Sequence, residues 1–185
     1  MTRGPAITTL PELDATQRAH SDATRAHIEA RVAASGGWLP FDEYMELALY
    51  APGLGYYSAG ATKFGAAGDF VTAPEISDLF SRALAAQFAD ILRELGGESR
   101  ASILELGAGS GRLAGVVLRE LATLQQSPSA YSILEVSADL IERQRATVTA
   151  LAGGEAARAH WLERLPMGHS GVIVANEVLD ALPTD

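Results

Sequence analysis

The chain has 185 residues, 48% of them hydrophobic and 20% charged, which is enough for one domain with a core and a small accessory segment. It has no cysteine, which excludes disulfides and thiolate metal sites, and its four histidines lack metal-ligand spacing, so no metal site is predicted. The formal charge of −9 disfavours nucleic acid as the main partner but can attract a basic protein.

The hydropathy of the chain and the composition of its first 17 residues bear on its cellular location. No apolar run approaches the roughly 18 residues of a membrane helix, so no membrane association is predicted. The first 17 residues lack the apolar core of a secretory signal, and Glu12 and Asp14 disfavour a transit peptide. We therefore expect a cytoplasmic protein.

Two helices are predicted near the N-terminus. Residues 1–20 are expected to lack regular structure. Residues 21–35 carry a thin apolar stripe and end at two glycines, which are typical of a helix stop. Residues 41–50 predict a shorter helix with Asp42 near its N-cap, ended before Pro52.

Residues 51–75 combine glycines, prolines and aromatic residues, which predicts a long ordered loop or a small hairpin; a floppy surface loop is the alternative. Residues 76–95 follow as the clearest helix. Its apolar residues recur at helical spacing: Ile76, Phe80, Leu84, Phe88, Ile91 and Leu95.

From there strands and helices alternate, and we divide the chain near Gly97. Residues 1–97 are expected to form a helical and aromatic-loop cap segment, and residues 98–185 a sheet domain. The predicted elements are strand 102–106, helix 112–124, strand 131–136, helix 137–152, a weak strand near 158–161 and strand 171–178. This βαβαββ order predicts an α/β fold with a parallel sheet and helical crossovers.

A glycine turn separates the first of these strands from its helix. Gly107, Gly109 and Gly111 give the pattern G-x-G-x-G, which lets backbone N–H groups approach a ligand closely. Arg112 stands where the third glycine of a dinucleotide fingerprint would fall. No G-K-[ST] follows, so a P-loop is excluded.

Two acids accompany the turn. Glu105, inside an apolar strand, would repel a pyrophosphate but suits the cationic amino group of S-adenosylmethionine; a structural carboxylate is the alternative. Glu135, at the end of the second strand, can accept both ribose hydroxyls. Together with the turn they predict a cofactor site of the class I methyltransferase type.

The last strand runs into Asn176, Glu177 and Asp180, at the edge where open α/β sheets bind ligands. Glu177 could orient an amine or a guanidinium by charge-assisted hydrogen bonds. An equally compatible reading has Asn176 capping the next helix and Glu177 in its first turn.

Five stretches carry a family resemblance, which covers about residues 38–183. They are "FDEYMELALYAPGLGYYS", "FGAAGDFVTAPEIS", "ILELGAGSGRLA", "ILEVSADLIERQ" and "ANEVLDALP". Together they resemble the MidA-like family of class I S-adenosylmethionine-dependent methyltransferases. The "GDFVTAPEIS" and "ANEVLDALP" blocks are far more specific to this family than the glycine turn. The resemblance implies a Rossmann-like sheet, S-adenosylmethionine as methyl donor and, in the member that assembles mitochondrial complex I, a protein arginine substrate.

The resemblance also assigns residues. It implies that three groups of residues bind the cofactor. The cofactor turn comprises Glu105, Gly107, Ala108, Gly109 and Gly111, and Glu135 is the acid that binds the ribose. Asp69, Phe70 and Thr72 belong to a block that closes over the cofactor. Asn176 and Glu177 match the motif beside the active site and are the expected catalytic residues.

The expected function is therefore S-adenosylmethionine-dependent methylation of a basic, arginine-containing protein, linked to assembly of a respiratory complex. Because family members are roughly twice as long, we expect this chain to be a fragment with the N-terminal half of the sheet, neither stable nor active alone. The alternatives are a non-catalytic assembly module, an inactive fragment, or an NAD-dependent oxidoreductase, which Arg112 and Glu105 disfavour. The sequence predicts no oligomeric state.

Overall fold

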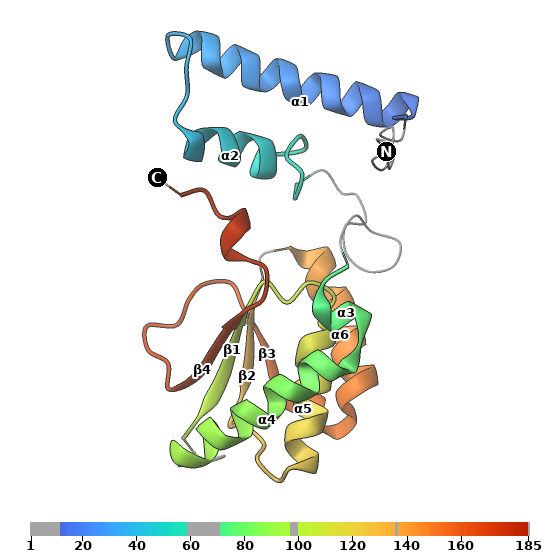
Figure 1. Ribbon diagram of the computed structural model, residues 1–185, viewed down its shortest axis with the longest axis vertical. Helices are drawn as coiled ribbons and strands as arrows, with labels where there is room; N and C mark the ends of the chain where they lie inside the picture. The colour runs from blue at the N-terminus through green and yellow to red at the C-terminus, as the bar shows by residue number, and fades with distance from the viewer. Residues whose placement is uncertain (1–11, 59–70, 97–99, 136, 185) are drawn as a thin grey trace, which may run out of the picture. The chain divides into compact units, whose positions relative to one another are not determined.

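A computed structural model describes residues 12–58, 71–96, 100–135 and 137–184 of the chain (Figure 1). The chain forms two compact units, which are described separately below. A helical unit comprises residues 1–61 with 181–185, and a sheet unit comprises residues 62–180. Among the described helices, none combines the length and apolar character that a bilayer span requires.

The helical unit contains α1 (Ala15–Ala34) and α2 (Phe41–Tyr50). Helix α1 begins earlier than predicted, because Asp14 and Gln17 form a reciprocal capping box. The Asp14 carboxylate accepts from the Gln17 N–H at 2.8 Å, and the Gln17 side chain accepts from the Asp14 N–H at 3.0 Å. Residues 15–20 are therefore helical. Helix α2 has the predicted bounds, with Pro40 as its N-cap and Asp42 in its first turn.

The chain turns back onto α2 after that helix ends. The N–H groups of Tyr56 and Tyr57 donate to carbonyls of α2 at 2.9 and 2.7 Å. The Tyr57 ring stacks on Tyr50, with 5.5 Å between the centroids, and meets Tyr56 edge-on at 5.1 Å. The Tyr50 hydroxyl donates to the Ala181 carbonyl at 2.7 Å. The predicted loop is thus ordered over residues 51–58, while residues 59–70 lie outside the described part.

The sheet unit carries four parallel strands, whose order across the sheet is β3-β2-β1-β4. Its elements are α3 (Ala73–Ile76), α4 (Asp78–Glu94), β1 (Ser102–Leu106), α5 (Arg112–Thr123), β2 (Tyr131–Leu134), α6 (Ala138–Ala152), the 3-10 helix η2 (Gly153–Arg158), β3 (Ala159–Leu162) and β4 (Gly171–Ala175). The 3-10 turn η3 (Leu179–Ala181) spans the boundary between the two units along the chain. The predicted βαβαββ order and parallel sheet are confirmed. The order 3-2-1-4 is that of a doubly wound fold, whose strand order reverses between β1 and β4.

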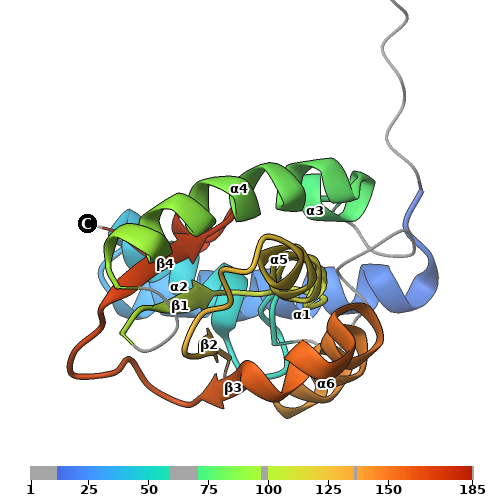
Figure 2. The same ribbon diagram turned by 90° about the horizontal axis from the view of Figure 1, so that it is seen from below.

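Helices α4, α5 and α6 lie along one face of this sheet (Figures 1 and 2). The core between them is apolar, with Ile103, Tyr131 and Ile133 from the strands fully buried. Burying this face stabilises the fold by roughly 25 cal/mol for each Å² of apolar surface removed from water.

Helix α4 buries a different stripe from the predicted one. Its buried residues are Ser81, Ala85, Phe88, Ala89 and Leu92. Ile76, predicted to start that stripe, is 73% exposed in α3, because Ser77 caps α4 and starts a new helix. Helix α4 packs against α5, and its residues Ala85, Phe88, Ala89 and Leu92 belong to the same core as the strands. The compact units therefore divide near residue 61, and not near Gly97.

Candidate cofactor site at the glycine turn

The glycine turn joins β1 to α5 in a left-handed backbone conformation. The φ angles are +64° at Gly107, +54° at Gly109 and +83° at Gly111, values that side chains other than glycine adopt at a cost. A Cβ on Gly107 would lie 2.7 Å from Val178 Cγ2, and one on Gly111 would lie 3.0 Å from Gln144 Cα. The close neighbours Val178 and Gln144 therefore require glycine at positions 107 and 111, whether or not a ligand is bound.

The sheet register brings the predicted site residues to one edge. Leu106, the last residue of β1, is paired with Leu134 of β2 on one side and Ala175 of β4 on the other. The carboxyl ends of these three strands therefore lie together, at the point where the strand order reverses. The glycine turn with the buried Ala108, Glu135, and the segment with Asn176 and Glu177 all follow from this edge.

Two hydrogen bonds among the described residues orient the Glu135 carboxylate at the end of β2. Its Oε1 accepts from the Ser137 N–H at 2.9 Å, and its Oε2 accepts from Gln144 Nε2 at 3.1 Å. Ser137 is the N-cap of α6, and its hydroxyl oxygen accepts a hydrogen bond from the Leu140 N–H. The carboxylate thus has a defined orientation beside the turn, where an acid can accept ribose hydroxyls.

Glu105 is buried in the protein and does not lie at the surface of the site. Its side chain is 2% exposed, and its Oε2 accepts a hydrogen bond from the Tyr131 hydroxyl at 2.8 Å. Burial raises the pKa of Glu105 to about 7, although the bond from Tyr131 opposes this rise. Burial, together with the Glu105 charge, also raises the pKa of Tyr131. The structure thus gives Glu105 a protein partner, and its contact with a cofactor amino group stays a prediction.

Gln144 is a residue of this edge that the sequence reading missed. It is fully buried, and its Nε2 donates to the Gly109 carbonyl and to the Glu135 carboxylate, both at 3.1 Å. Its Oε1 accepts from Trp161 Nε1 at 2.9 Å. The sequence did contain a signal for its burial, because Leu140 and Val148, four residues before and after it, place Gln144 on the apolar face of the helix.

Helix α3 contacts the glycine turn through Glu75, a second residue that was not predicted from the sequence. The Ser110 hydroxyl donates to the Glu75 carboxylate and accepts from the Arg112 N–H at 3.2 Å. Glu75 belongs to the "GDFVTAPEIS" block, so the block's described part contacts the turn. Thr72 is the half-buried N-cap of α3. The other two predicted residues of the block, Asp69 and Phe70, lie outside the described residues.

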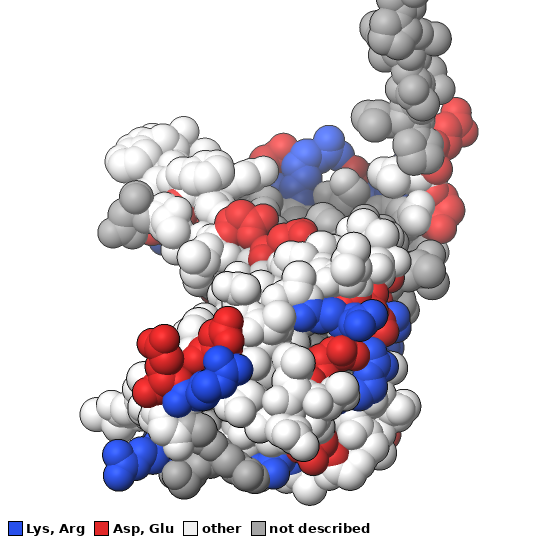
Figure 3. All heavy atoms as spheres, turned by 60° about the horizontal axis from the view of Figure 1, so that its bottom comes forward, with Lys and Arg blue, Asp and Glu red and all other residues white. Residues whose placement is uncertain are grey.

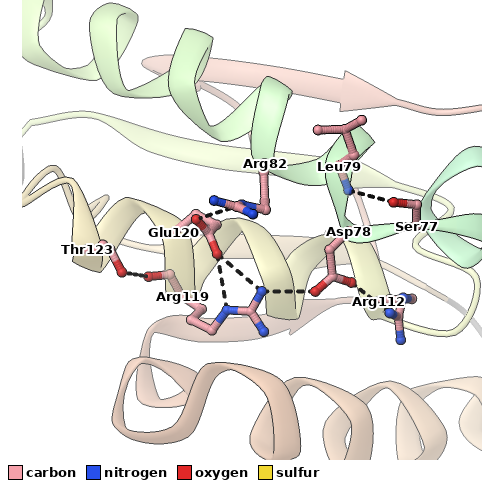
Figure 4. A network of polar contacts seen from close by, with 8 residues as sticks. All are labelled: Ser77, Asp78, Leu79, Arg82, Arg112, Arg119, Glu120 and Thr123. Atoms are coloured by element: carbon pink, nitrogen blue, oxygen red, sulfur yellow. Dashed lines mark hydrogen bonds and ion pairs between the residues drawn. The ribbon is translucent and has the colours of Figure 1, made fainter.

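Ion pairs join the start of α4 to α5 next to the turn (Figure 4). Asp78 accepts from Arg112 at 2.6 Å and from Arg119 at 3.0 Å, while Glu120 pairs with Arg119 and Arg82, each at 3.2 Å. The hydrogen bond from Arg119 is the main cause that lowers the pKa of Asp78. On the face drawn in Figure 3, basic and acidic side chains lie in mixed groups. Arg112, the cation next to the turn in the sequence, is thus engaged by a carboxylate.

Residues 176 and 177 follow β4 in an irregular segment. Glu177 is exposed and has a left-handed backbone, with φ at +54°, and Asn176 is half-buried. Such strain at a residue other than glycine costs about 1–3 kcal/mol and is concentrated at functional sites. The next helical turn, η3, begins at Leu179, so the alternative reading of Glu177 in the first turn of a helix is wrong.

A hollow of about 440 Å³ lies elsewhere on the molecule. Its lining comes entirely from the helical unit and includes Thr24, Tyr44 and Tyr56. Because no residue of the turn or of the strand ends lines it, we do not assign it to the cofactor site.

Comparisons with known proteins identify the family. Residues 83–185, more than half of the chain, match the model of a family described as "Putative S-adenosyl-L-methionine-dependent methyltransferase". A crystal structure from Burkholderia thailandensis, of a candidate methyl transferase bound to S-adenosyl-homocysteine, is 47% identical with a TM-score of 0.85 and covers 95% of this chain and 46% of that one. A second crystal structure from the same organism is 45% identical with a TM-score of 0.79, covering 95% and 44%.

Curated relatives carry a more specific name. The mitochondrial protein arginine methyltransferase NDUFAF7 homolog of Drosophila melanogaster is 30% identical, over 94% of this chain and 44% of the relative. The Homo sapiens NDUFAF7 is 34% identical, over 62% and 27%. The chain thus spans less than half the length of these relatives. The family resemblance is nonetheless confirmed, and the chain belongs to this family of S-adenosyl-L-methionine-dependent methyltransferases.

Proposed function

We propose that this chain carries the cofactor-binding part of a protein methyltransferase that acts on arginine side chains. The observation that carries the proposal is the meeting of the glycine turn and the Glu135 carboxylate at the edge where the strand order reverses. The S-adenosyl-homocysteine bound to the 47% identical crystal structure supports the cofactor, and the relatives' names support the arginine substrate.

The residues at this edge fit S-adenosylmethionine in their chemistry. The turn presents backbone and the strand ends present carboxylates, whereas the guanidinium of Arg112 is held by Asp78. This set suits a nucleoside that carries a cationic amino group and no phosphate. When bound, S-adenosylmethionine supplies a methyl group on a positively charged sulfonium.

Each part of the site has a proposed role. The glycine turn allows close approach of the backbone to the cofactor, and Glu135 accepts hydrogen bonds from the ribose hydroxyls. Glu177, exposed at the end of β4, holds the substrate guanidinium by charge-assisted hydrogen bonds, and Asn176 beside it helps to orient the same group. A guanidinium is a very weak acid, so it loses its proton late, to solvent, and Glu177 acts by orientation and charge.

The partner and the compartment are part of the same proposal. The formal charge of −9 favours a basic protein segment as substrate. The relatives are named as mitochondrial proteins. The cytoplasmic location expected from the sequence of this chain stays a prediction, as does a link to the assembly of a respiratory complex.

Calorimetric titration with S-adenosyl-homocysteine, and with NADH as the control ligand, tests the cofactor. Radiolabelled methyl transfer to a basic arginine peptide, compared with the same peptide carrying lysine in place of arginine, tests the reaction. In a protein extended to the length of these relatives we expect S-adenosyl-homocysteine, and not NADH, to bind, and the arginine peptide, and not the lysine peptide, to be labelled. Residues 1–185 by themselves are expected to label neither peptide. Binding of NADH instead would overturn the proposal. Cofactor binding by the extended protein without labelling of any arginine would favour the non-catalytic assembly module.

A further inference from the structure

We propose that Gln144 is a positioning residue of the cofactor site, which sets the ribose preference by holding the Glu135 carboxylate against the glycine turn. The inference rests on the proposed function and extends it to a buried residue on α6. Gln144 itself contacts neither the cofactor nor the substrate. It acts through the two groups to which its amide nitrogen donates, the Glu135 carboxylate and the Gly109 carbonyl.

The orientation of the Gln144 amide follows from its partners. The Gly109 carbonyl and the Glu135 carboxylate are acceptors, so the NH₂ end of the amide must face them. The indole N–H of Trp161 is a donor, so the carbonyl end must face Trp161. A reversed amide would set acceptor against acceptor twice and donor against donor once. The three bonds together therefore specify one arrangement of a fully buried side chain.

The surroundings hold Gln144 in place. The indole of Trp161 is covered by the Arg145 guanidinium, 4.2 Å from the ring centroid. The backbone of Gln144 also lies against Gly111, where a Cβ would come within 3.0 Å of Gln144 Cα. Helix α6 thus contacts the glycine turn at Gly109 through a side chain and at Gly111 through its backbone. A displacement of Gln144 would therefore alter both the turn and the ribose acid.

This arrangement explains why a polar residue occupies the core side of α6. A buried amide is tolerated when its hydrogen bonds are made, and here it links two segments 26 residues apart, Gly109 and Glu135. A carboxylate can accept more than one hydrogen bond at each oxygen. The bond from Gln144 therefore fixes the direction of the carboxylate and leaves it able to accept ribose hydroxyls.

The test compares S-adenosyl-homocysteine with an analogue that lacks both ribose hydroxyls, in a protein extended to the length of its relatives. The measured quantity is the dissociation constant of the analogue divided by that of S-adenosyl-homocysteine. In the wild-type protein we expect the hydroxyls to strengthen binding by roughly 10- to 100-fold. Gln144→Met removes all three hydrogen bonds at similar volume, and Gln144→Glu places a second carboxylate opposite Glu135. In both variants the ratio should fall to about 3 or less, and adding Glu135→Ala should lower it no further.

Val148→Ala is the matched control, because Val148 is buried one turn later on the same helix. It should lower the melting temperature through lost packing and leave the ratio unchanged. A Gln144 variant that melts earlier but keeps the wild-type ratio would overturn the inference, since Gln144 would then be a structural residue only. If wild-type protein does not bind S-adenosyl-homocysteine at all, the proposed function itself fails.

A measurement on the wild-type protein decides the matter should the Gln144 variants not fold. The side-chain amide signals of Gln144 in a ¹⁵N NMR spectrum should shift when S-adenosyl-homocysteine binds, because its ribose hydroxyls then share the Glu135 carboxylate. The analogue without hydroxyls should shift them much less. Equal shifts with both ligands would contradict the proposed coupling.

Discussion

The Tyr131 hydroxyl lies 2.8 Å from the Glu105 carboxylate, between two parallel strands and beneath the helices that cover them. Both side chains are excluded from water, with exposures of 0% for Tyr131 and 2% for Glu105. A carboxylate at this depth is costly to ionise, and one hydroxyl donor offsets part of that cost. This is why the pKa of Glu105 is raised to about 7 and does not stay near 4.5.

Glu105→Gln should therefore remove a pH dependence of stability. Below pH 4.5 Glu105 is neutral in both the folded and the unfolded chain. Between pH 4.5 and about 7 the unfolded chain releases the proton first, so wild-type stability falls as pH rises. The difference corresponds to roughly 3 kcal/mol in the free energy of unfolding, measured relative to Glu105→Gln by urea titrations from pH 4 to 8. Tyr131→Phe removes the bond that lowers the pKa of Glu105 in the fold, so the fall should start at the same pH and extend to higher pH. A difference that does not vary with pH would refute the assignment.

Glu135→Ala should weaken binding of S-adenosyl-homocysteine by roughly 1.5–3 kcal/mol, because charged hydrogen bonds to the ribose are lost. Isothermal titration measures the effect. As a control, Glu142→Ala removes an exposed carboxylate from α6, the helix that follows Glu135, and should leave the affinity unchanged. Equal affinities for the wild type and Glu135→Ala would remove Glu135 from the site.

Gly111→Ala should destabilise the fold by about 2 kcal/mol or more, even without ligand. The new methyl group would lie 3.0 Å from Gln144 Cα, and the residue would keep a φ of +83°. Gly154→Ala is the matched control, since nothing lies within 4 Å of a Cβ there, and should change stability by at most about 0.5 kcal/mol. Thermal melts of the two variants give the comparison, and similar melting temperatures would contradict the close approach of α6.

Asp78→Asn should cost roughly 1 kcal/mol of stability near pH 7, because two partly exposed arginines lose their shared carboxylate. The pKa of Asp78 is lowered in the fold, so its contribution is present above pH 3.8 and is lost as the pH falls below that. Denaturant titrations at pH 7 and pH 3 should show this. Asp90→Asn, which removes an exposed ion pair with Arg93, should change stability by less than about 0.5 kcal/mol. Equal effects at both aspartates would argue against the network.

Glu177→Gly should separate stability from function. Glycine adopts the left-handed backbone without the steric cost that Glu177 bears at φ +54°, so stability should stay the same or rise by up to about 1 kcal/mol. Methyl transfer to an arginine peptide should nonetheless fall, because the carboxylate that holds the guanidinium is gone. Gln125→Gly, at φ +56° after α5, should have the same effect on stability with full transfer. Unchanged transfer in Glu177→Gly would exclude the proposed role.

The alternation of strands and helices, the glycine turn and the acids that follow strand ends could all be predicted from the amino-acid sequence. These features are local, because the period of apolar residues and the chemistry of a turn depend on neighbours along the chain. The sequence also held the capping box of Asp14 and Gln17, a local signal that our reading passed over and that starts α1 at Ala15.

Which side chains contact one another could not be predicted in the same way, because these contacts form only when the sheet and its helices pack. The buried face of α4 combines small residues with Phe88 and Leu92, and it shares only Phe88 with the predicted apolar stripe. Gln144, Glu135 and Gly109 come together because α6 packs across the turn after β1, a contact between segments far apart in the sequence. Glu105 meets Tyr131 through strand pairing. Such contacts depend on the register and packing of the whole sheet, which the local pattern of residues does not specify.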